Sequence, residues 1–300
     1  MIPLIDSLSA GAVVLDGGLG TLLEARGHDL TSSLWSARLL LEEPAAIRAA
    51  HREFFDAGAR VAITASYQVS YDGLARQGVD ESTTTALLQG SVAEAVAARD
   101  SLAGDGTCRF VAASIGPYGA SLADGSEYRG DYGLSVDELA AWHRRRVEVL
   151  AGSGADLLAV ETIPCLDELV AITRELRRSD APAWVSVTIA GGALRSGESL
   201  AEAFAVLDRA PEVVAVGVNC SDPAEMTGAI RTARGVTGKP IVLYPNSGER
   251  WDAVGRRWLG EAHFAPELVR EWRDAGAAMI GGCCRVGPAQ IAAIAATLRS

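Results

Sequence analysis

The stretch GSGADLLAVETIPCLDELVAITRELRRSD, residues 152–180, contains one complete example of the pattern from which the chain is built. A Gly-Ala pair at residues 154–155, of the kind that ends a helix, leads directly into an apolar run, residues 156–161. A continuously apolar run is typical of a parallel strand covered by helices. The run ends at Glu161, and apolar residues at helical spacing follow over residues 166–178. The stretch therefore predicts a strand, a loop and a helix in succession.

The same unit recurs along the whole chain. The predicted strands are residues 12–16, 60–64, 109–114, 156–161, 183–189, 213–219, 240–244 and 277–281. The predicted helices are residues 44–57, 80–103, 135–151, 166–178, 199–209, 222–234, 265–275 and 288–298. Eight such units in 300 residues, with no linker between them, predict an α/β protein that forms a single (β/α)8 TIM barrel, one domain spanning residues 1–300.

A doubly wound open sheet is the competing architecture. The glycines at 17, 18 and 20 lack the spacing of a dinucleotide-binding fingerprint, which disfavours it. Polar and reactive residues also follow nearly every predicted strand, as at the mouth of a barrel. Two long segments, residues 116–133 after the third strand and 245–262 after the seventh, are predicted to be mouth loops, and part of the first could be a lid.

Charge and cysteine content narrow the class of function. The net charge of −11 argues against nucleic acid and membrane as partners and leaves small-molecule substrates, while nothing in the sequence fixes an oligomeric state. The first residues do not read as a signal peptide, and five scattered cysteines are not a disulfide framework. We therefore expect a cytoplasmic protein, in which a disulfide between Cys283 and Cys284 is disfavoured.

Three cysteines come at predicted strand ends: Cys220 after the sixth strand, and Cys283 and Cys284 after the eighth. Thiolates suit Zn²⁺, and a site with three protein ligands leaves a fourth position for a substrate. The glycines at 281 and 282 would give the chain the freedom to aim two adjacent cysteines at one metal. Inert burial is the alternative for isolated cysteines, and we assign it, or a loop position, to Cys108 and Cys165.

Two acidic residues end other strands, Asp16 the first and Glu161 the fourth. An N-cap or an ion pair would explain Asp16, but a carboxylate at the end of an apolar strand is costly to bury unpaired. We predict that the two carboxylates hold a substrate ammonium, and that backbone N–H groups from Gly17 and Gly18 onward hold the carboxylate of the same amino acid. The four histidines lie away from strand ends and are interpreted as structural or solvated.

At this point several segments together resemble the homocysteine S-methyltransferases over essentially the whole chain. They are LDGGLGTLLEARGHDL (15–30), SLWSARLL (33–40), TASYQVS (64–70), SIGPYGASLADGSEYRGDYG (114–133), VETIP (160–164), GVNCSDP (217–223), YPNSGERWD (244–252) and GGCCR (281–285). The resemblance implies that Cys220, Cys283 and Cys284 are zinc ligands and that Asp16 and Glu161 hold the homocysteine ammonium. Asn219, beside Cys220, is counted with the substrate-binding residues.

The resemblance also implies the reaction: methyl transfer to homocysteine, forming methionine. The YRGDY and LWSA segments favour a sulfonium donor, S-methylmethionine or S-adenosylmethionine. Aromatic candidates for contact with that cation are Trp35, Tyr118, Tyr128 and Trp251, each of which could equally be packing. The alternatives are betaine or a corrinoid as donor, a selenol as acceptor, or a non-catalytic zinc-binding barrel.

Overall fold

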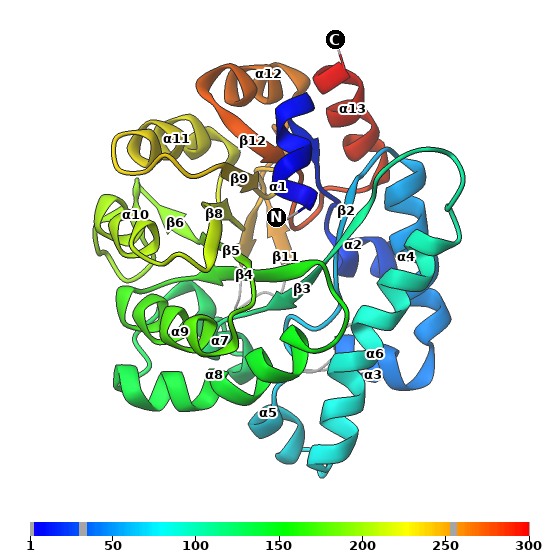
Figure 1. Cartoon of the computed structure of the whole chain (residues 1–300), viewed down its shortest axis with the longest axis vertical. Helices are drawn as coiled ribbons and strands as arrows, with labels where there is room; N and C mark the ends of the chain where they lie inside the picture. Colours follow the sequence, from blue (N-terminus) through cyan, green and yellow to red (C-terminus); the bar gives the residue numbers. More distant parts are fainter. Residues whose placement is uncertain (1–2, 30–34, 253–256, 300) are drawn as a thin grey trace.

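The barrel consists of eight parallel strands in the order β1-β12-β9-β8-β5-β4-β3-β2. This computed structural model describes residues 3–29, 35–252 and 257–299, without the side chains of residues 35–37, 250–252 and 257–258. The strands are β1 (Val13–Val14), β2 (Val61–Ile63), β3 (Phe110–Ile115), β4 (Leu157–Ile163), β5 (Ala183–Val187), β8 (Val213–Asn219), β9 (Ile241–Tyr244) and β12 (Ala277–Ile280). A parallel bridge between Leu15 and Val61 joins the first strand to β2 and closes the ring (Figure 1). The predicted TIM barrel is confirmed.

A ring of helices surrounds the strands (Figure 1). Its main members are α4 (Pro44–Asp56), α6 (Glu81–Asp100), α8 (Val136–Ala151), α9 (Leu166–Ser179), α10 (Leu200–Asp208), α11 (Met226–Arg234), α12 (Pro266–Ala275) and α13 (Pro288–Arg299). A capping box is present at the start of α8, where the Ser135 hydroxyl accepts from the Glu138 N–H and the Glu138 carboxylate accepts from the Ser135 N–H. The helix at 222–234 begins instead as a 3-10 turn, Pro223–Glu225.

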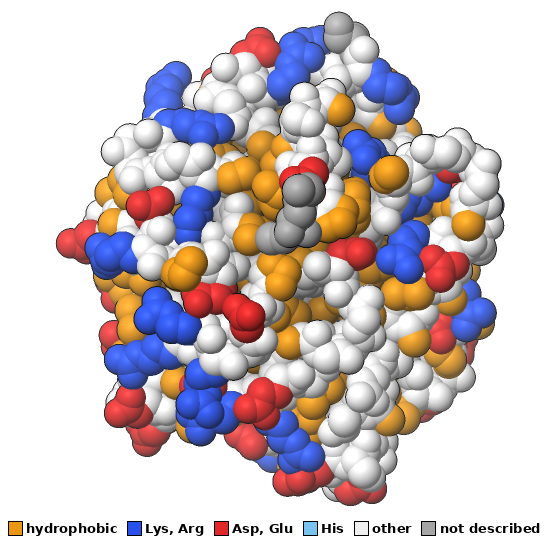
Figure 2. Space-filling model, viewed as in Figure 1, with side chains coloured by type: hydrophobic (Ala, Val, Ile, Leu, Met, Phe, Trp, Pro, Cys, Tyr) orange, Lys and Arg blue, Asp and Glu red, His pale blue; other side chains and the backbone are white. Residues whose placement is uncertain are grey.

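The interior of the barrel is a packed core. Inward-facing side chains from successive strands, among them Val61, Phe110, Trp184 and Met279, form one buried cluster with Leu4. Leu4 belongs to the short helix α1 (Pro3–Ser7), which covers the end of the barrel where the strands begin. Figure 2 shows this face, with apolar side chains gathered around α1 and charged ones scattered over the periphery. The opposite end, where the strands finish, is left to carry the site.

The loops at that end hold more structure than the sequence suggested. The predicted strand 183–189 stops at Val187, and a hairpin of β6 (Ile189–Ala190) and β7 (Ala193–Leu194) follows it. The long loops contain α7 (Tyr118–Leu122), the 3-10 turn η2 (Ser126–Tyr128), and the hairpin β10 (Arg250–Asp252) and β11 (Arg257–Leu259). Three further short helices, which follow β1 or β2, were also not predicted: α2 (Leu19–Ala25), α3 (Trp35–Glu42) and α5 (Tyr71–Ala75). Across the described residues, no helix is both long and apolar enough to cross a membrane.

Candidate active site

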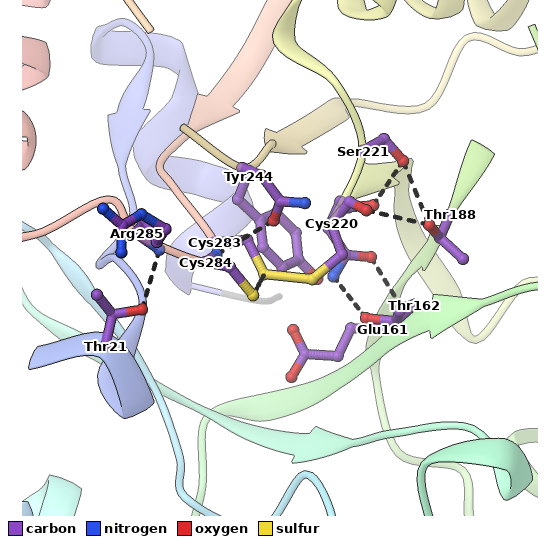
Figure 3. Close-up of a disulfide and its surroundings, with 12 residues drawn as sticks. Thr21, Glu161, Thr162, Thr188, Cys220, Ser221, Tyr244, Cys283, Cys284 and Arg285 are labelled. Atoms are coloured by element: carbon purple, nitrogen blue, oxygen red, sulfur yellow. Dashed lines mark hydrogen bonds between the residues drawn. A yellow bond between two sulfur atoms is a disulfide. The ribbon is translucent and has the colours of Figure 1, made fainter. Parts of the chain in front are cut away.

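The three cysteines predicted as ligands come together at the end of the barrel. Their Sγ atoms lie within 4.8 Å of one another, although Cys220 follows β8 and the other two follow β12 (Figure 3). Backbone hydrogen bonds fix each position: the Cys220 N–H donates to Tyr244 O at 3.2 Å and the Cys283 N–H to Pro245 O at 2.7 Å. The Cys284 N–H donates to the side-chain oxygen of Asn246 at 3.2 Å. Three sulfurs from two strands thus converge on one point.

Two of these sulfurs are covalently joined, which corrects the expectation that the cysteines are unpaired. A disulfide links Cys220 to Cys283, whose Cα atoms are 5.6 Å apart, within the range that the bond requires. The sulfur of Cys284 is free and lies 4.0 Å from that of Cys283. The convergence of two strand ends makes this pairing accessible, whereas the 63-residue separation hides it in the sequence.

Backbone strain marks the same strand ends. Thr162, Cys220 and Arg285 adopt positive φ values of 63°, 48° and 63°, a region that non-glycine residues seldom occupy and that is often found at functional sites. The glycines at 281 and 282 serve close packing, since a Cβ on Gly281 would lie 2.6 Å from Asp16 O. Neither glycine takes a positive φ. The unusual backbone conformations that were expected at these glycines occur at Cys220 and Arg285 instead.

Asp16 and Glu161 both lie in the mouth and are buried, with exposures of 1% and 7%. One Asp16 oxygen accepts from the Ile63 N–H at 2.8 Å, while its other oxygen, Oδ1, has no partner among the described residues. Burial raises the pKa of Asp16 well above its usual value, and the charge of Glu161 raises it further. Burial also raises the pKa of Glu161 to about 7, against the opposing hydrogen bonds from Ser114 and Tyr244. Two carboxyls in this state would be stabilised by a bound cation.

Two predicted substrate-binding residues are engaged elsewhere in the structure. The Asn219 side chain accepts from the Thr162 N–H and donates to Thr162 Oγ1, both at 2.7 Å, and so fixes the strained turn after Glu161. The Gly18 N–H donates to Val286 O at 2.9 Å, and a Cβ on Gly17 would lie 2.2 Å from that same oxygen. Asn219 and Gly18 therefore position the site, whereas the Gly17 N–H donates to none of the described residues.

Hydroxyl groups that the sequence did not single out complete the surroundings. Thr188 Oγ1 donates to Cys220 O at 3.2 Å and lies 3.3 Å from Ser221 Oγ, which itself donates to Asn219 O at 2.9 Å (Figure 3). Ser114 donates to Glu161, and Trp184 Nε1 donates to the Tyr244 hydroxyl at 3.1 Å. The signal that could have found them is a polar side chain inside an otherwise apolar strand.

A buried network anchors the loop after β3. His143 Nε2 lies 2.9 Å from Glu168 Oε1, an oxygen that also accepts from the Tyr118 N–H at 2.5 Å. The Arg146 guanidinium donates to Gly116 O at 3.1 Å and Tyr67 O at 3.0 Å. His143 is thus structural, as predicted. Tyr118 packs edge to face on Tyr132 and Trp142, which is the packing alternative considered for it.

The sequence matches known proteins over most of its length. The family described as homocysteine S-methyltransferase matches residues 13–298. The chain is 46% identical to the homocysteine S-methyltransferase of Escherichia coli (strain K12), covering 95% of this chain and 94% of that protein. This chain belongs to the homocysteine S-methyltransferase family. It is also 44% identical to homocysteine S-methyltransferase YbgG of Bacillus subtilis (strain 168), covering 96% of this chain and 95% of the relative.

Solved structures of this family support the fold and bear on the cysteines. The homocysteine methyltransferase MmuM of Escherichia coli in its metallated form matches with a TM-score of 0.87 at 43% identity, covering 96% of each chain. Its oxidised form matches with a TM-score of 0.89 at 43% identity, covering 99% of each chain. A metallated relative and a group of three cysteines together indicate a metal centre in this family member.

The remaining predicted residues lie outside the cysteine group or outside the described part of the structure. Cys165 is buried and Cys108 is exposed in a loop, as predicted. The side chains of Trp35 and Trp251 fall outside the described residues. Tyr128 lies near Cys284, whose charge raises the pKa of the tyrosine in addition to the larger effect of burial.

Proposed function

We propose that this protein transfers a methyl group from a sulfonium donor, S-methylmethionine or S-adenosylmethionine, to the thiol of L-homocysteine, with Zn²⁺ held by Cys220, Cys283 and Cys284. The observation that carries the proposal is the convergence of three sulfurs, within 4.8 Å, beside two buried acidic side chains. Homocysteine offers both complementary groups, a thiol and an ammonium. We also propose that residues 1–300 act as one domain.

The donor set fits zinc. Three sulfur ligands are typical of Zn²⁺ sites, and a three-residue site keeps a position open for substrate. Burial raises the pKa of the Cys284 thiol to about 11, with the negative charges of Glu127 and Glu161 adding to the effect, so the thiol stays protonated near neutral pH unless a cation is bound. Cys220 and Cys283 can serve as ligands only when their disulfide is reduced, and we therefore propose that the protein acts in a reducing compartment, the cytoplasm.

The chain's own residues orient homocysteine. The carboxylates of Asp16 and Glu161 bind its ammonium, which restores a partner to the unpaired Asp16 oxygen. The Gly17 N–H is available to the substrate carboxylate. Bound zinc supplies the positive charge that keeps a coordinated thiol ionised at neutral pH. Asn219 holds the turn at Thr162 so that Glu161 keeps its direction.

The transfer itself needs no general base. The homocysteine sulfur attacks the donor's methyl carbon in line, a new S–C bond forms, the S–C bond of the sulfonium breaks, and its electron pair stays on the donor sulfur, which leaves as a neutral thioether. The barrel contributes proximity and alignment of the two sulfurs. This agrees with the absence of histidine from the group of residues described around the cysteines.

The proposal is tested on reduced, purified protein by measuring bound zinc and methionine formation together. Homocysteine is supplied with S-methylmethionine, S-adenosylmethionine or betaine in parallel assays. We expect one zinc per chain and turnover with a sulfonium donor. Zinc without turnover on any donor would contradict the proposal and favour a binding role, whereas turnover on betaine alone would move the chain to a different donor class. Replacing homocysteine by its selenol analogue tests the acceptor.

A further inference from the structure

Two charged side chains at the rim of the mouth interact with opposite charges only at a distance, Glu127 with Arg129 and Arg195 with Glu225. Glu127 lies in η2, in the loop after β3, and Arg195 lies just beyond β7, in the segment that follows β5. Within the described part of the chain, neither forms an ion pair with the other or with any other residue. Both flank Tyr128, and we call the three residues the donor lip. An unpaired anion and an unpaired cation on one small surface are complementary to a zwitterion.

Glu127 is held in place as a partly buried anion. Its Oε2 atom is shielded from solvent and accepts no hydrogen bond from the described residues. The charge of Glu127 raises the pKa values of Tyr67, Tyr128 and Cys284, so the carboxylate lies on the side of the loop that faces the sulfurs. Desolvation without a partner is costly, and a bound ammonium would offset that cost.

The backbone around Glu127 is packed tightly against α7. A Cβ placed on Gly119 would lie 2.4 Å from the Glu127 nitrogen, so only glycine allows this approach. The adjoining Ser126 N–H donates to Asp124 Oδ1 at 2.9 Å. These contacts give the carboxylate a fixed position before any ligand arrives, which lowers the entropy cost of binding.

Arg195 contacts Tyr128 and is linked to the cysteine group through a hydrogen bond to Thr188. Its guanidinium carbon lies 5.3 Å from the centre of the Tyr128 ring, and its Nε donates to Thr188 Oγ1 at 3.3 Å. That hydroxyl donates in turn to Cys220 O at 3.2 Å. The terminal guanidinium nitrogens donate to none of the described residues and present the planar fork that matches a carboxylate.

The strand order places Arg195 across the mouth from Asp16. Around the ring of eight, β5 lies four places from β1. Asp16 and Gly17 follow β1, whereas Arg195 lies in the segment beyond β5. Glu161 comes from β4, which lies between β3 and β5, so this carboxylate is a neighbour of the lip. The sulfurs come from β8 and β12, between β5 and β1. A second amino acid can therefore reach the sulfurs from the side of Arg195 while the first contacts Asp16.

We propose that the donor lip binds the amino-acid head group of the methyl donor, Glu127 holding the α-ammonium and Arg195 the α-carboxylate, with Tyr128 positioning Arg195. This rests on the proposed function and assigns residues to the amino-acid head group that S-methylmethionine and S-adenosylmethionine share. Betaine has a carboxylate but no ammonium N–H, so it satisfies only Arg195. The sulfonium at the far end of the donor side chain then faces the cysteines.

The test measures binding to the reduced, zinc-loaded protein by equilibrium dialysis. The three probes are S-methylmethionine, dimethyl(aminopropyl)sulfonium, which lacks the carboxylate, and dimethylsulfoniobutanoate, which lacks the ammonium. We expect the wild type to bind each truncated probe about 10- to 100-fold more weakly than S-methylmethionine. Glu127→Gln should bind S-methylmethionine and the probe without the ammonium with similar affinity. Arg195→Gln should bind S-methylmethionine and the probe without the carboxylate with similar affinity.

Arg174→Gln is the matched control, since Arg174 is an exposed arginine on α9 that pairs with Asp137 and has no contact with the lip. It should bind all three probes as the wild type does, and every variant should keep its homocysteine affinity. Wild-type affinity for S-methylmethionine in both Glu127→Gln and Arg195→Gln would overturn the inference, and so would a wild type that binds none of the probes. Lip-dependent binding without methyl transfer would instead defeat the proposed function and leave the inference standing.

Discussion

Two parts of the mouth are built differently. Asp16, Glu161 and Asn219 end strands of the barrel, are at most 7% exposed, and are fixed by hydrogen bonds to other strands. We call this the acceptor wall. The donor lip is carried by a 3-10 turn and by the segment just beyond a hairpin, and its charged groups have few contacts. The acceptor wall is part of the barrel, whereas the lip is added to it.

The difference teaches how one barrel can keep its acceptor and change its donor. Altering Asp16 or Glu161 disturbs a packed interior in which polar groups form hydrogen bonds across strands. The charged side chains of the lip make few contacts, and loop positions of this kind tolerate substitution better. We therefore expect acceptor specificity to be costly to change and donor specificity to be adjustable through residues 116–133 and 189–198.

The largest expected effect on activity comes from the cysteine group, where acceptor and donor meet. Cys284→Ala should lose bound zinc and reduce turnover on the order of 1,000-fold or more, because it removes a ligand from the reacting centre. Metal analysis and steady-state rates measure this, with circular dichroism to show that the barrel still folds. Cys165→Ala, which removes a buried cysteine outside the sulfur group, is the control and should keep both zinc and turnover. Retained zinc in Cys284→Ala would contradict the ligand assignment.

The next largest effect should be confined to the acceptor wall. Glu161→Gln keeps a group that can bond to Ser114 but removes the charge, and should weaken homocysteine binding by about 2–5 kcal/mol. Calorimetric titrations with homocysteine and, separately, with S-methylmethionine measure the affinities for the acceptor and for the donor. Affinity for the donor should stay within about twofold, since the lip is untouched. Equal loss on both sides would show that wall and lip are not separate.

The pH dependence should also belong to the wall. Because the pKa of Glu161 is raised to about 7, its ammonium-binding form is depleted as the pH falls through that value. Affinity for methionine, which has no thiol to titrate, should fall about 10-fold from pH 8 to pH 6, following the ionised fraction. The raised pKa of Asp16 acts in the same direction. A pH-independent affinity in the wild type, matching that of Glu161→Gln, would refute this role for the carboxylate.

The smallest effect should fall on the lip alone. Gly119→Ala places a Cβ against the Glu127 backbone, so the turn must shift, and the KM for the donor should rise about 3- to 10-fold with little change in the KM for homocysteine. Gly90→Ala is the matched control, because its added Cβ meets no atom within 4 Å. An unchanged donor KM in Gly119→Ala would show that the position of Glu127 does not matter.

The sequence predicted the wall better than the lip for a physical reason. Apolar runs and the residues that end them are local signals, so the eight strands, the three cysteines, Asp16 and Glu161 could be found directly. Their partners could not, because Ser114 reaches Glu161 across 47 residues and Asn219 reaches Thr162 across 57. Glu127 and Arg195 lie in polar loops, where a charged residue carries no signal until its missing partner is seen.

The account requires that acceptor and donor occupy the mouth together and that the methyl passes directly between their sulfurs. Initial rates measured while homocysteine and S-methylmethionine are varied together test this most directly. We predict double-reciprocal lines that intersect, as a ternary complex requires. Parallel lines would indicate a methylated enzyme intermediate and one site used twice, which would contradict the separation of wall and lip.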